Sequence, residues 1–101
     1  MRLSENYRKV IKQAALEIWG DQASVILFGS RVDDSKKGGD IDLLLRINRE
    51  EDTKEIVRKK VKFLSQLDIQ LGEQKIDLII ATKENQYINI VQTAMQTGIE
   101  L

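Results

Sequence analysis

Apolar residues recur every three or four positions in three stretches of the chain, the spacing of helices that cover a core on one side. The first stretch predicts a helix over residues 4–19, which Ser4 caps and Gly20 ends. Its apolar side is expected to consist of Tyr7, Val10, Ile11, Ala14 and Ile18.

The second stretch predicts a helix over residues 53–71, because Asp52 followed by Glu55 resembles a capping box and Gly72 can end the helix. Its expected apolar stripe is Val57, Val61, Leu64, Leu67 and Leu71. The third stretch predicts a last helix that opens at Lys83-Glu84-Asn85 and runs to about Thr97. Its broad stripe, wide enough to suggest deep burial or a partner surface, is Tyr87, Ile88, Ile90, Val91, Ala94 and Met95.

Three short, nearly continuous apolar runs predict strands that are covered on both faces, at residues 24–28, 40–47 and 75–81. Helices alternate with these strands along the chain. The expected fold class is therefore α/β (α+β), a small mixed three-stranded sheet backed by helices. At 101 residues the chain is expected to form one domain over residues 1–101.

The composition narrows the chemistry mainly through what it lacks. The chain contains no Cys and no His, which excludes thiolate nucleophiles, sulfur-ligated zinc and the commonest general base. Lys and Arg number 16 and Asp and Glu number 16, so the net charge is zero and binding to nucleic acid or a membrane is not expected. No apolar run approaches the roughly 18–20 residues of a membrane span, and the expected location is the cytoplasm.

The residues that could form a reactive site stand at the end of the first predicted strand and at the start of the second. Gly29-Ser30 follows the first strand and offers backbone N–H groups and a hydroxyl to a phosphate. Asp40 and Asp42 open the second strand, and residues i and i+2 of a strand point to one face, about 6–7 Å apart. Two carboxylates aimed at one place repel each other unless a cation such as Mg²⁺ or Mn²⁺ lies between them. The pattern predicts a metal-dependent phosphoryl or nucleotidyl transfer site.

A third carboxylate, Asp77, stands inside the third predicted strand among Ile and Leu residues. Because an unpaired buried carboxylate costs several kcal/mol, we expect Asp77 to face the same side as Asp40 and Asp42. Three carboxylates on neighbouring strands could hold two metal ions about 3.5–4 Å apart. In that arrangement Asp77 would also help to deprotonate an incoming hydroxyl.

Other charged residues have an ordinary interpretation beside a functional one. Arg31 could touch a triphosphate or simply belong to the loop, and for Lys36 and Lys37 a solvated loop is at least as good an interpretation. The basic run Arg58-Lys59-Lys60 with Lys62 is typical of a solvated helix face. The other phosphate-binding motifs, G-x-x-x-x-G-K-[ST] and G-x-G-x-x-G, are absent.

Gly29-Ser30 followed by Asp40-Ile41-Asp42 resembles the G-S-x(n)-D-x-D signature of the polymerase-β-like nucleotidyltransferase superfamily. The chain also resembles the minimal nucleotidyltransferase (MNT) branch of that superfamily, in its small size, its Gly29-Ser30-Arg31 triplet and its later Asp77. That branch contains the MntA-like antitoxins of HEPN/MNT toxin–antitoxin modules. Two departures from the usual pattern are Gly39, where many members have Ser, and the absence of a Gly soon after the triplet.

The resemblance implies a polymerase-β-like fold in which Gly29 and Ser30 hold the β- and γ-phosphates of a nucleoside triphosphate. It implies that Asp40 and Asp42 bind Mg²⁺ and that Asp77 completes the triad. Antitoxins of this branch transfer AMP from ATP to a tyrosine of the HEPN ribonuclease toxin. A homo- or hetero-oligomer is possible.

Two alternatives to that activity stay open: a non-catalytic antitoxin that masks its partner, and a transferase for a small molecule or RNA ends. The chain has no residues left for the helical lobe that larger nucleotidyltransferases use to grip the base and the acceptor. We therefore expect a partner protein to supply that wall.

Overall fold

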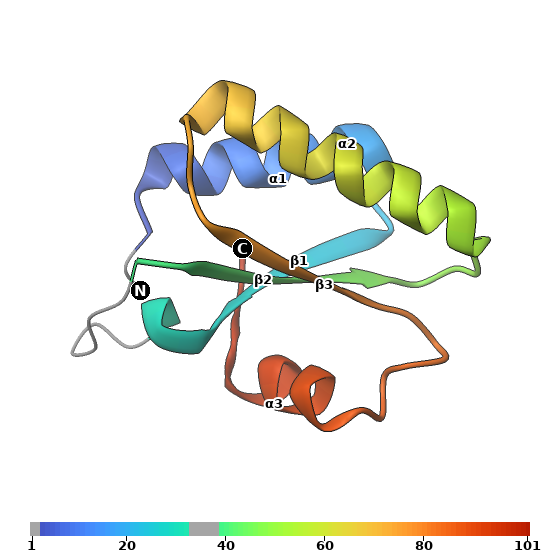
Figure 1. Cartoon of the computed structure of the whole chain (residues 1–101). Coiled ribbons are helices and arrows are strands. Elements are labelled where there is room, and N and C mark those ends of the chain that lie inside the picture. Colours follow the sequence, from blue (N-terminus) through green and yellow to red (C-terminus); the bar gives the residue numbers. More distant parts are fainter. Residues whose placement is uncertain (1–2, 33–38) are drawn as a thin grey trace.

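One mixed sheet with helices on both faces makes up the part of the chain that the structure, a computed structural model, describes: residues 3–32 and 39–101 (Figure 1). The elements in chain order are α1 (Glu5–Trp19), β1 (Ala23–Phe28), the 3₁₀ turn η1 (Gly29–Val32), β2 (Ile41–Ile47), α2 (Thr53–Leu71), β3 (Ile76–Ala81), α3 (Asn89–Thr97) and β4 (Ile99–Glu100). Within that part, no helix is long and apolar enough to cross a membrane.

The sheet has the strand order β3-β2-β1-β4. β1 pairs antiparallel with β2 and with β4, whereas β2 and β3 are parallel and are joined through α2. The α/β class is confirmed, but the expected count of three strands is wrong by one. β4 contains only two residues, too few to show a pattern in sequence. Its position depends on Gly98, where a Cβ would overlap Ile26 and the Leu27 carbonyl oxygen.

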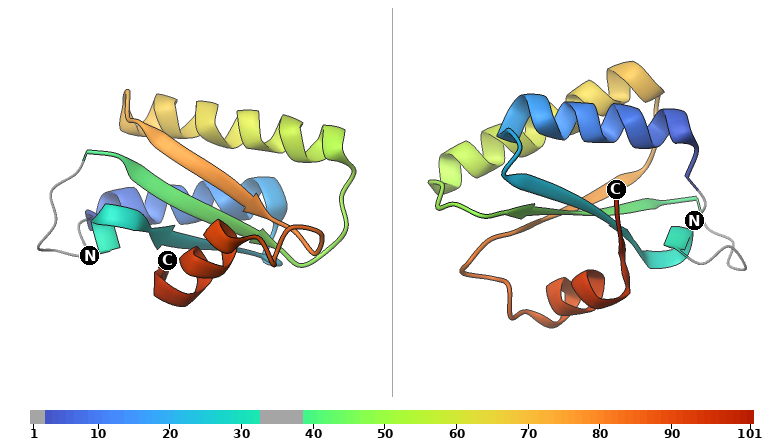
Figure 2. Two further views of the ribbon diagram at one scale, coloured as in Figure 1. Left: turned by 60° about the horizontal axis from the view of Figure 1, so that its bottom comes forward. Right: turned by 180° about the vertical axis from the view of Figure 1, so that it is seen from behind.

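The two faces of the sheet are covered unequally. α1 and α2 lie side by side on one face, and the shorter α3 lies on the other (Figures 1 and 2). Alternate β2 residues Ile41, Leu43 and Leu45 are fully buried in the core under α1 and α2. Leu44 points to the opposite face, into a smaller cluster with Val91 and Ala94 of α3. The larger core therefore fixes the sheet, and the smaller one attaches α3.

α2 has the predicted bounds, because its two ends are set locally. The Asp52 carboxylate accepts a hydrogen bond from the Lys54 N–H at 2.7 Å, and the Gly72 N–H donates to the Asp68 carbonyl at 3.0 Å. The predicted buried face is partly wrong. Phe63 and Leu67 are fully buried, while Val57 and Val61 are 56% and 59% exposed.

The buried face of α2 differs from the predicted one because α2 packs against α1 as well as against the sheet. Phe63 meets Trp19 edge to face, with ring centroids 5.4 Å apart. Gln66 donates a hydrogen bond to Glu17 of α1 at 2.9 Å. These contacts turn α2 away from the stripe that its sequence spacing suggested.

The last helix is shorter than predicted, and the Asn85 side chain instead closes a turn at the end of β3. Its Oδ1 accepts from the Thr82 N–H at 2.8 Å and its Nδ2 donates to the Ile80 carbonyl at 2.8 Å. Residues 82–88 therefore form a turn before α3 begins at Asn89. Of the predicted stripe, Val91 and Ala94 are buried and Met95 is half-buried, whereas Tyr87, Ile88 and Ile90 are exposed.

Candidate active site

The structure brings together the three aspartates that the sequence singled out. In the parallel ladder Asp42 of β2 is the direct partner of Asp77 of β3, so both side chains point to the same face of the sheet. Asp40 stands just before β2, and its charge acts on the Asp42 carboxyl at that face. It is the face that α3 covers only in part (Figure 1). Asp77 is exposed there, and Asp40 and Asp42 are half-buried.

Gly29 lies directly against the Asp42 carboxylate. Phe28, the last residue of β1, pairs with Asp42 across the sheet, and the chain then turns at Gly29 with φ of +77°. A Cβ at this position would overlap Asp42 Oδ2 and would lie 3.1 Å from Asp42 Cγ. Glycine is thus required for two reasons, the positive φ and the close approach of the carboxylate.

The surroundings of the Asp42 carboxyl disfavour its charged form. Burial raises its pKa above the ordinary value, and the charges of Asp77 and Asp40 and a hydrogen bond with the Asp77 carboxyl raise it further. Lys75 acts in the opposite direction but does not reverse the shift. Positive charge placed among these carboxylates would relieve the repulsion.

Lys75 is a site residue that sequence reasoning missed. Its Nζ lies 3.4 Å from Asp40 Oδ2 in an ion pair that is open to solvent, since the Lys75 side chain is 72% exposed. Its main-chain carbonyl accepts a hydrogen bond from the Ile41 N–H at 3.0 Å, which fixes the register of β2 and β3 beside the site. Its place immediately before the strand that carries Asp77 was the signal in the sequence.

The turn η1 is tied to the start of β2 by Arg31, whose guanidinium donates a hydrogen bond to the Gly39 carbonyl at 3.0 Å. This contact holds the two ends of the loop together and keeps Gly29 near the aspartates. The Ser30 main chain lies in the same turn, but its side chain lies outside what the structure describes. The predicted loop lysines Lys36 and Lys37 also fall outside the described residues.

The donor set fits a hard divalent cation, because it consists of carboxylate oxygens that repel one another. In the described ranges 3–32 and 39–101, however, no three acidic side chains stand close enough around one point to hold a metal ion as they are. Asp40 already has a positively charged neighbour in Lys75, whereas Asp42 and Asp77 are direct partners across the β2–β3 ladder. Asp42 and Asp77 are therefore the residues that would hold an ion first.

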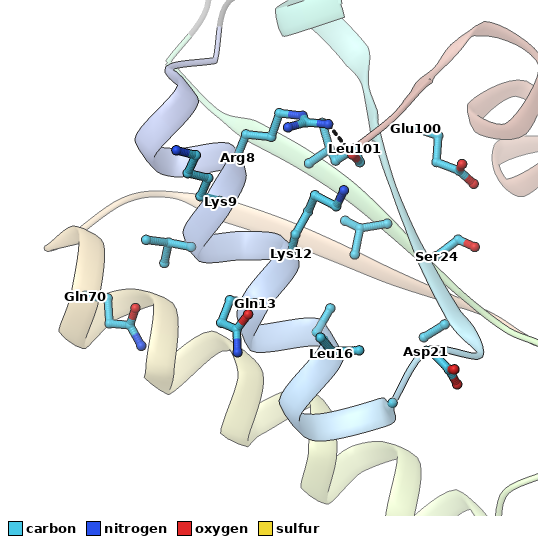
Figure 3. Close-up of a pocket in the computed structure, with 15 residues that line it drawn as sticks. Arg8, Lys9, Lys12, Gln13, Leu16, Asp21, Ser24, Gln70, Glu100 and Leu101 are labelled. Carbon is cyan, nitrogen blue, oxygen red and sulfur yellow. Dashed lines mark hydrogen bonds between the residues drawn. The ribbon is translucent and has the colours of Figure 1, made fainter.

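A groove of about 800 Å³ lies elsewhere, along α1 and the edge that β1 and β4 form. Figure 3 shows Arg8 and Lys12 extending from α1 toward this edge, with Arg8 hydrogen-bonded to the Leu101 main-chain oxygen at 2.9 Å. None of the aspartates described above lines this groove. It offers flexible surface cations but no set of groups suited to a reaction.

Comparison with protein-family models decides the family. A family model described as a nucleotidyltransferase domain matches residues 8–97, a range that contains Gly29 and all three aspartates. The chain belongs to the nucleotidyltransferase domain family. A search of curated proteins found no match.

Membership in the nucleotidyltransferase family supports the superfamily suggested by the Gly-Ser and Asp-x-Asp pattern. It also supports a transferase activity with a nucleoside triphosphate as substrate.

Proposed function

We propose that the chain is an adenylyltransferase that moves AMP from ATP to a hydroxyl group of a partner protein, with Asp40, Asp42 and Asp77 as its catalytic residues. The observation that supports this best is the position of Asp42. The charges of Asp77 and Asp40 both act on its carboxylate, which also lies against the Gly29 turn, so the carboxylates and the proposed phosphate-binding turn share one place. The site lies on an incompletely covered sheet face, where a large acceptor can approach.

The residues divide the work of an in-line displacement. The main chain of Gly29 and Ser30 holds the β- and γ-phosphates, and Arg31 keeps that turn against the start of β2. When bound, two Mg²⁺ ions would neutralise the phosphates and stabilise the attacking and leaving oxygens. In this proposal Asp77 receives the proton of the acceptor hydroxyl. The acceptor oxygen bonds to the α-phosphorus, the bond to the β-phosphate oxygen breaks, and pyrophosphate leaves.

The proposed acceptor is a tyrosine of a HEPN ribonuclease toxin, and the chain is then its antitoxin. This part of the proposal depends on the resemblance of the Gly29-Ser30-Arg31 triplet and the small domain to the minimal branch. The open site is consistent with it, because the described residues form no lobe around the aspartates and a partner could supply one.

The experiment is transfer of label from ATP to the toxin in the presence of Mg²⁺. Label at the α-phosphate should appear on the toxin and label at the γ-phosphate should not. Asp40→Ala, Asp42→Ala and Asp77→Ala should each abolish labelling, and Asp21→Ala, which removes an exposed carboxylate from a turn, should not. Equal labelling by the wild-type protein and the three variants would refute the catalytic proposal.

A second candidate, a non-catalytic antitoxin that masks its partner, is favoured by one observation. Asp40 is paired with Lys75, and no three acidic side chains among the described residues are arranged as metal ligands. If this candidate is right, Asp42→Ala will still neutralise the toxin in cells, and removal of ATP will make no difference. A transferase for a small molecule or RNA would instead label those acceptors and not the toxin.

A further inference from the structure

The outer edge of β3 is an open strand edge. In the described part of the chain β3 pairs only with β2, at one end of the sheet. Because the Lys75 carbonyl bonds to Ile41, the main-chain groups of residues 75, 77, 79 and 81 point to β2. Those of Ile76, Leu78 and Ile80 therefore point outward. Only the Ile80 carbonyl has a described partner among them, the Asn85 side chain.

An exposed stripe on α2 runs along the same side of the molecule. It consists of Lys54, Val57, Val61, Leu64 and Asp68, at the alternating three- and four-residue spacing of a coiled-coil seam. Val57 and Val61 are more than half exposed, and Leu64 is half-buried. The opposite flank of α2 faces α1, to which Gln66 is bonded. The stripe therefore lies on the side away from α1, where β3 is the outermost strand (Figures 1 and 2).

The charges of the stripe are complementary to those of an identical stripe running in the opposite direction. Lys54 stands seven residues before Val61 and Asp68 stands seven residues after it, since 61 − 54 and 68 − 61 are both 7. Both end residues are exposed, and no described ion pair involves either of them. Two antiparallel copies would bring each lysine to the aspartate of the other and place the valines between them.

We propose that two copies of this chain associate about a two-fold axis beside β3, with β3 pairing antiparallel to β3 and α2 lying along α2 of the second copy. The strand pairing and the helix packing are compatible with each other. The two β3 strands would lie about 4.8 Å apart, and the two α2 helices above them would lie about 8–10 Å apart. A second copy supplies at once the outward main-chain partners, the apolar neighbours and the opposite charges. An unrelated extended peptide would satisfy the strand edge only.

The oligomeric state tests this directly, by sedimentation velocity over a range of concentrations without nucleotide or toxin. The wild-type chain should dimerise, and Val61→Glu should sediment as a monomer. Ile69→Glu is the matched control, because Ile69 is 84% exposed on the same helix but lies off the stripe. A wild-type monomer at every concentration would overturn the proposal, as would equal effects of the two variants.

A charge exchange tests the head-to-tail arrangement. Lys54→Glu alone and Asp68→Lys alone should each weaken self-association by about tenfold or more, because like charges then meet at both ends of the interface. An equimolar mixture of the two variants should regain the dimer, since every facing pair is again of opposite sign. A mixture that associates no better than the single variants would overturn this arrangement.

Hydrogen exchange tests the strand pairing. The Leu78 amide points to the open edge, so its protection should rise with protein concentration as dimers form. The Asp77 amide points to β2 and should be protected at all concentrations, which makes it the internal control. Leu78 protection that does not change between monomer and dimer would overturn pairing through β3. None of these measurements depends on transfer activity, so their failure leaves the proposed function unaffected.

Discussion

The two faces of the same sheet differ in what their strands carry. Under α1 and α2, strand positions such as Ile41, Leu43 and Leu45 are apolar and fully buried. On the other face α3 spans nine residues and covers only part of the strands, and the uncovered end carries Asp42 and Asp77. Because successive side chains of a strand point to opposite faces, core residues and residues of the candidate site stand next to each other in the sequence. Substitutions on the two faces of the sheet should therefore affect stability and transfer separately.

Phe63→Ala should have the largest effect, and on folding. Phe63 is fully buried and packs against Trp19, so truncation should lower the free energy of unfolding by about 3–5 kcal/mol. Urea unfolding followed by circular dichroism measures this. Ile69→Ala on the exposed side of the same helix should change the free energy of unfolding by less than about 0.5 kcal/mol. Similar losses for both variants would contradict the assignment of the packed face.

Gly29→Ala should reduce nucleotidyl transfer by about 100-fold, because its Cβ would displace the Asp42 carboxylate. Transfer of α-labelled ATP measures the effect. Gly72→Ala is the control: Gly72 has almost the same φ, +79°, but no atom stands within 4 Å of its Cβ position. The control should therefore reproduce the backbone strain without the loss of transfer. Equal activities of the two variants would contradict the predicted displacement of the Asp42 carboxylate.

Asp42→Asn should abolish transfer yet raise the melting temperature in EDTA at neutral pH. Because the folded-state pKa of Asp42 is raised, the folded protein binds this proton more tightly than the unfolded chain. The associated stability is present at acidic pH and is lost as the pH rises through the raised pKa. The variant should therefore gain most over the wild type above that pKa. Melting curves recorded from acidic to neutral pH measure this effect, with Asp21→Asn as the control. The same pH dependence of the melting temperature in both variants would contradict the prediction.

Lys75→Met should have the smallest effect, a tightening of the apparent Mg²⁺ affinity in the transfer assay by about 2–5-fold. The exposed ion pair with Asp40 is worth little, and its loss frees that carboxylate for a metal ion. Lys83→Met, which removes an exposed lysine from a turn, is the control. Weaker Mg²⁺ binding in Lys75→Met would mean that Lys75 supports the ion site and does not compete with it.

Local signals explain what could be predicted from the sequence. Asp52 and Gly72 act within a few residues of themselves, and α2 begins and ends where they indicate. The cost of burying a carboxylate led to the expectation that Asp77 would lie beside Asp42. Long-range contacts were not visible in the pattern. The rotation of α2 depends on Trp19, and β4 exists only because Gly98 lets the chain approach β1. The pairing of Lys75 with Asp40 likewise depends on the register of strands far apart in sequence.

The order of the strands along the chain has a consequence for how the site assembles during folding. Gly29, Asp40 and Asp42 belong to one antiparallel hairpin formed by neighbouring segments, β1 and β2, whose contacts are short in sequence. Asp77 arrives on a parallel strand that can add only after α2 has crossed the sheet. The nascent hairpin thus carries an incomplete set of acidic groups, and the like-charge contact between Asp42 and Asp77 arises only when the edge strand β3 docks on β2. The repulsion between Asp42 and Asp77 therefore arises late in folding, after much of the β1–β2 hairpin has formed.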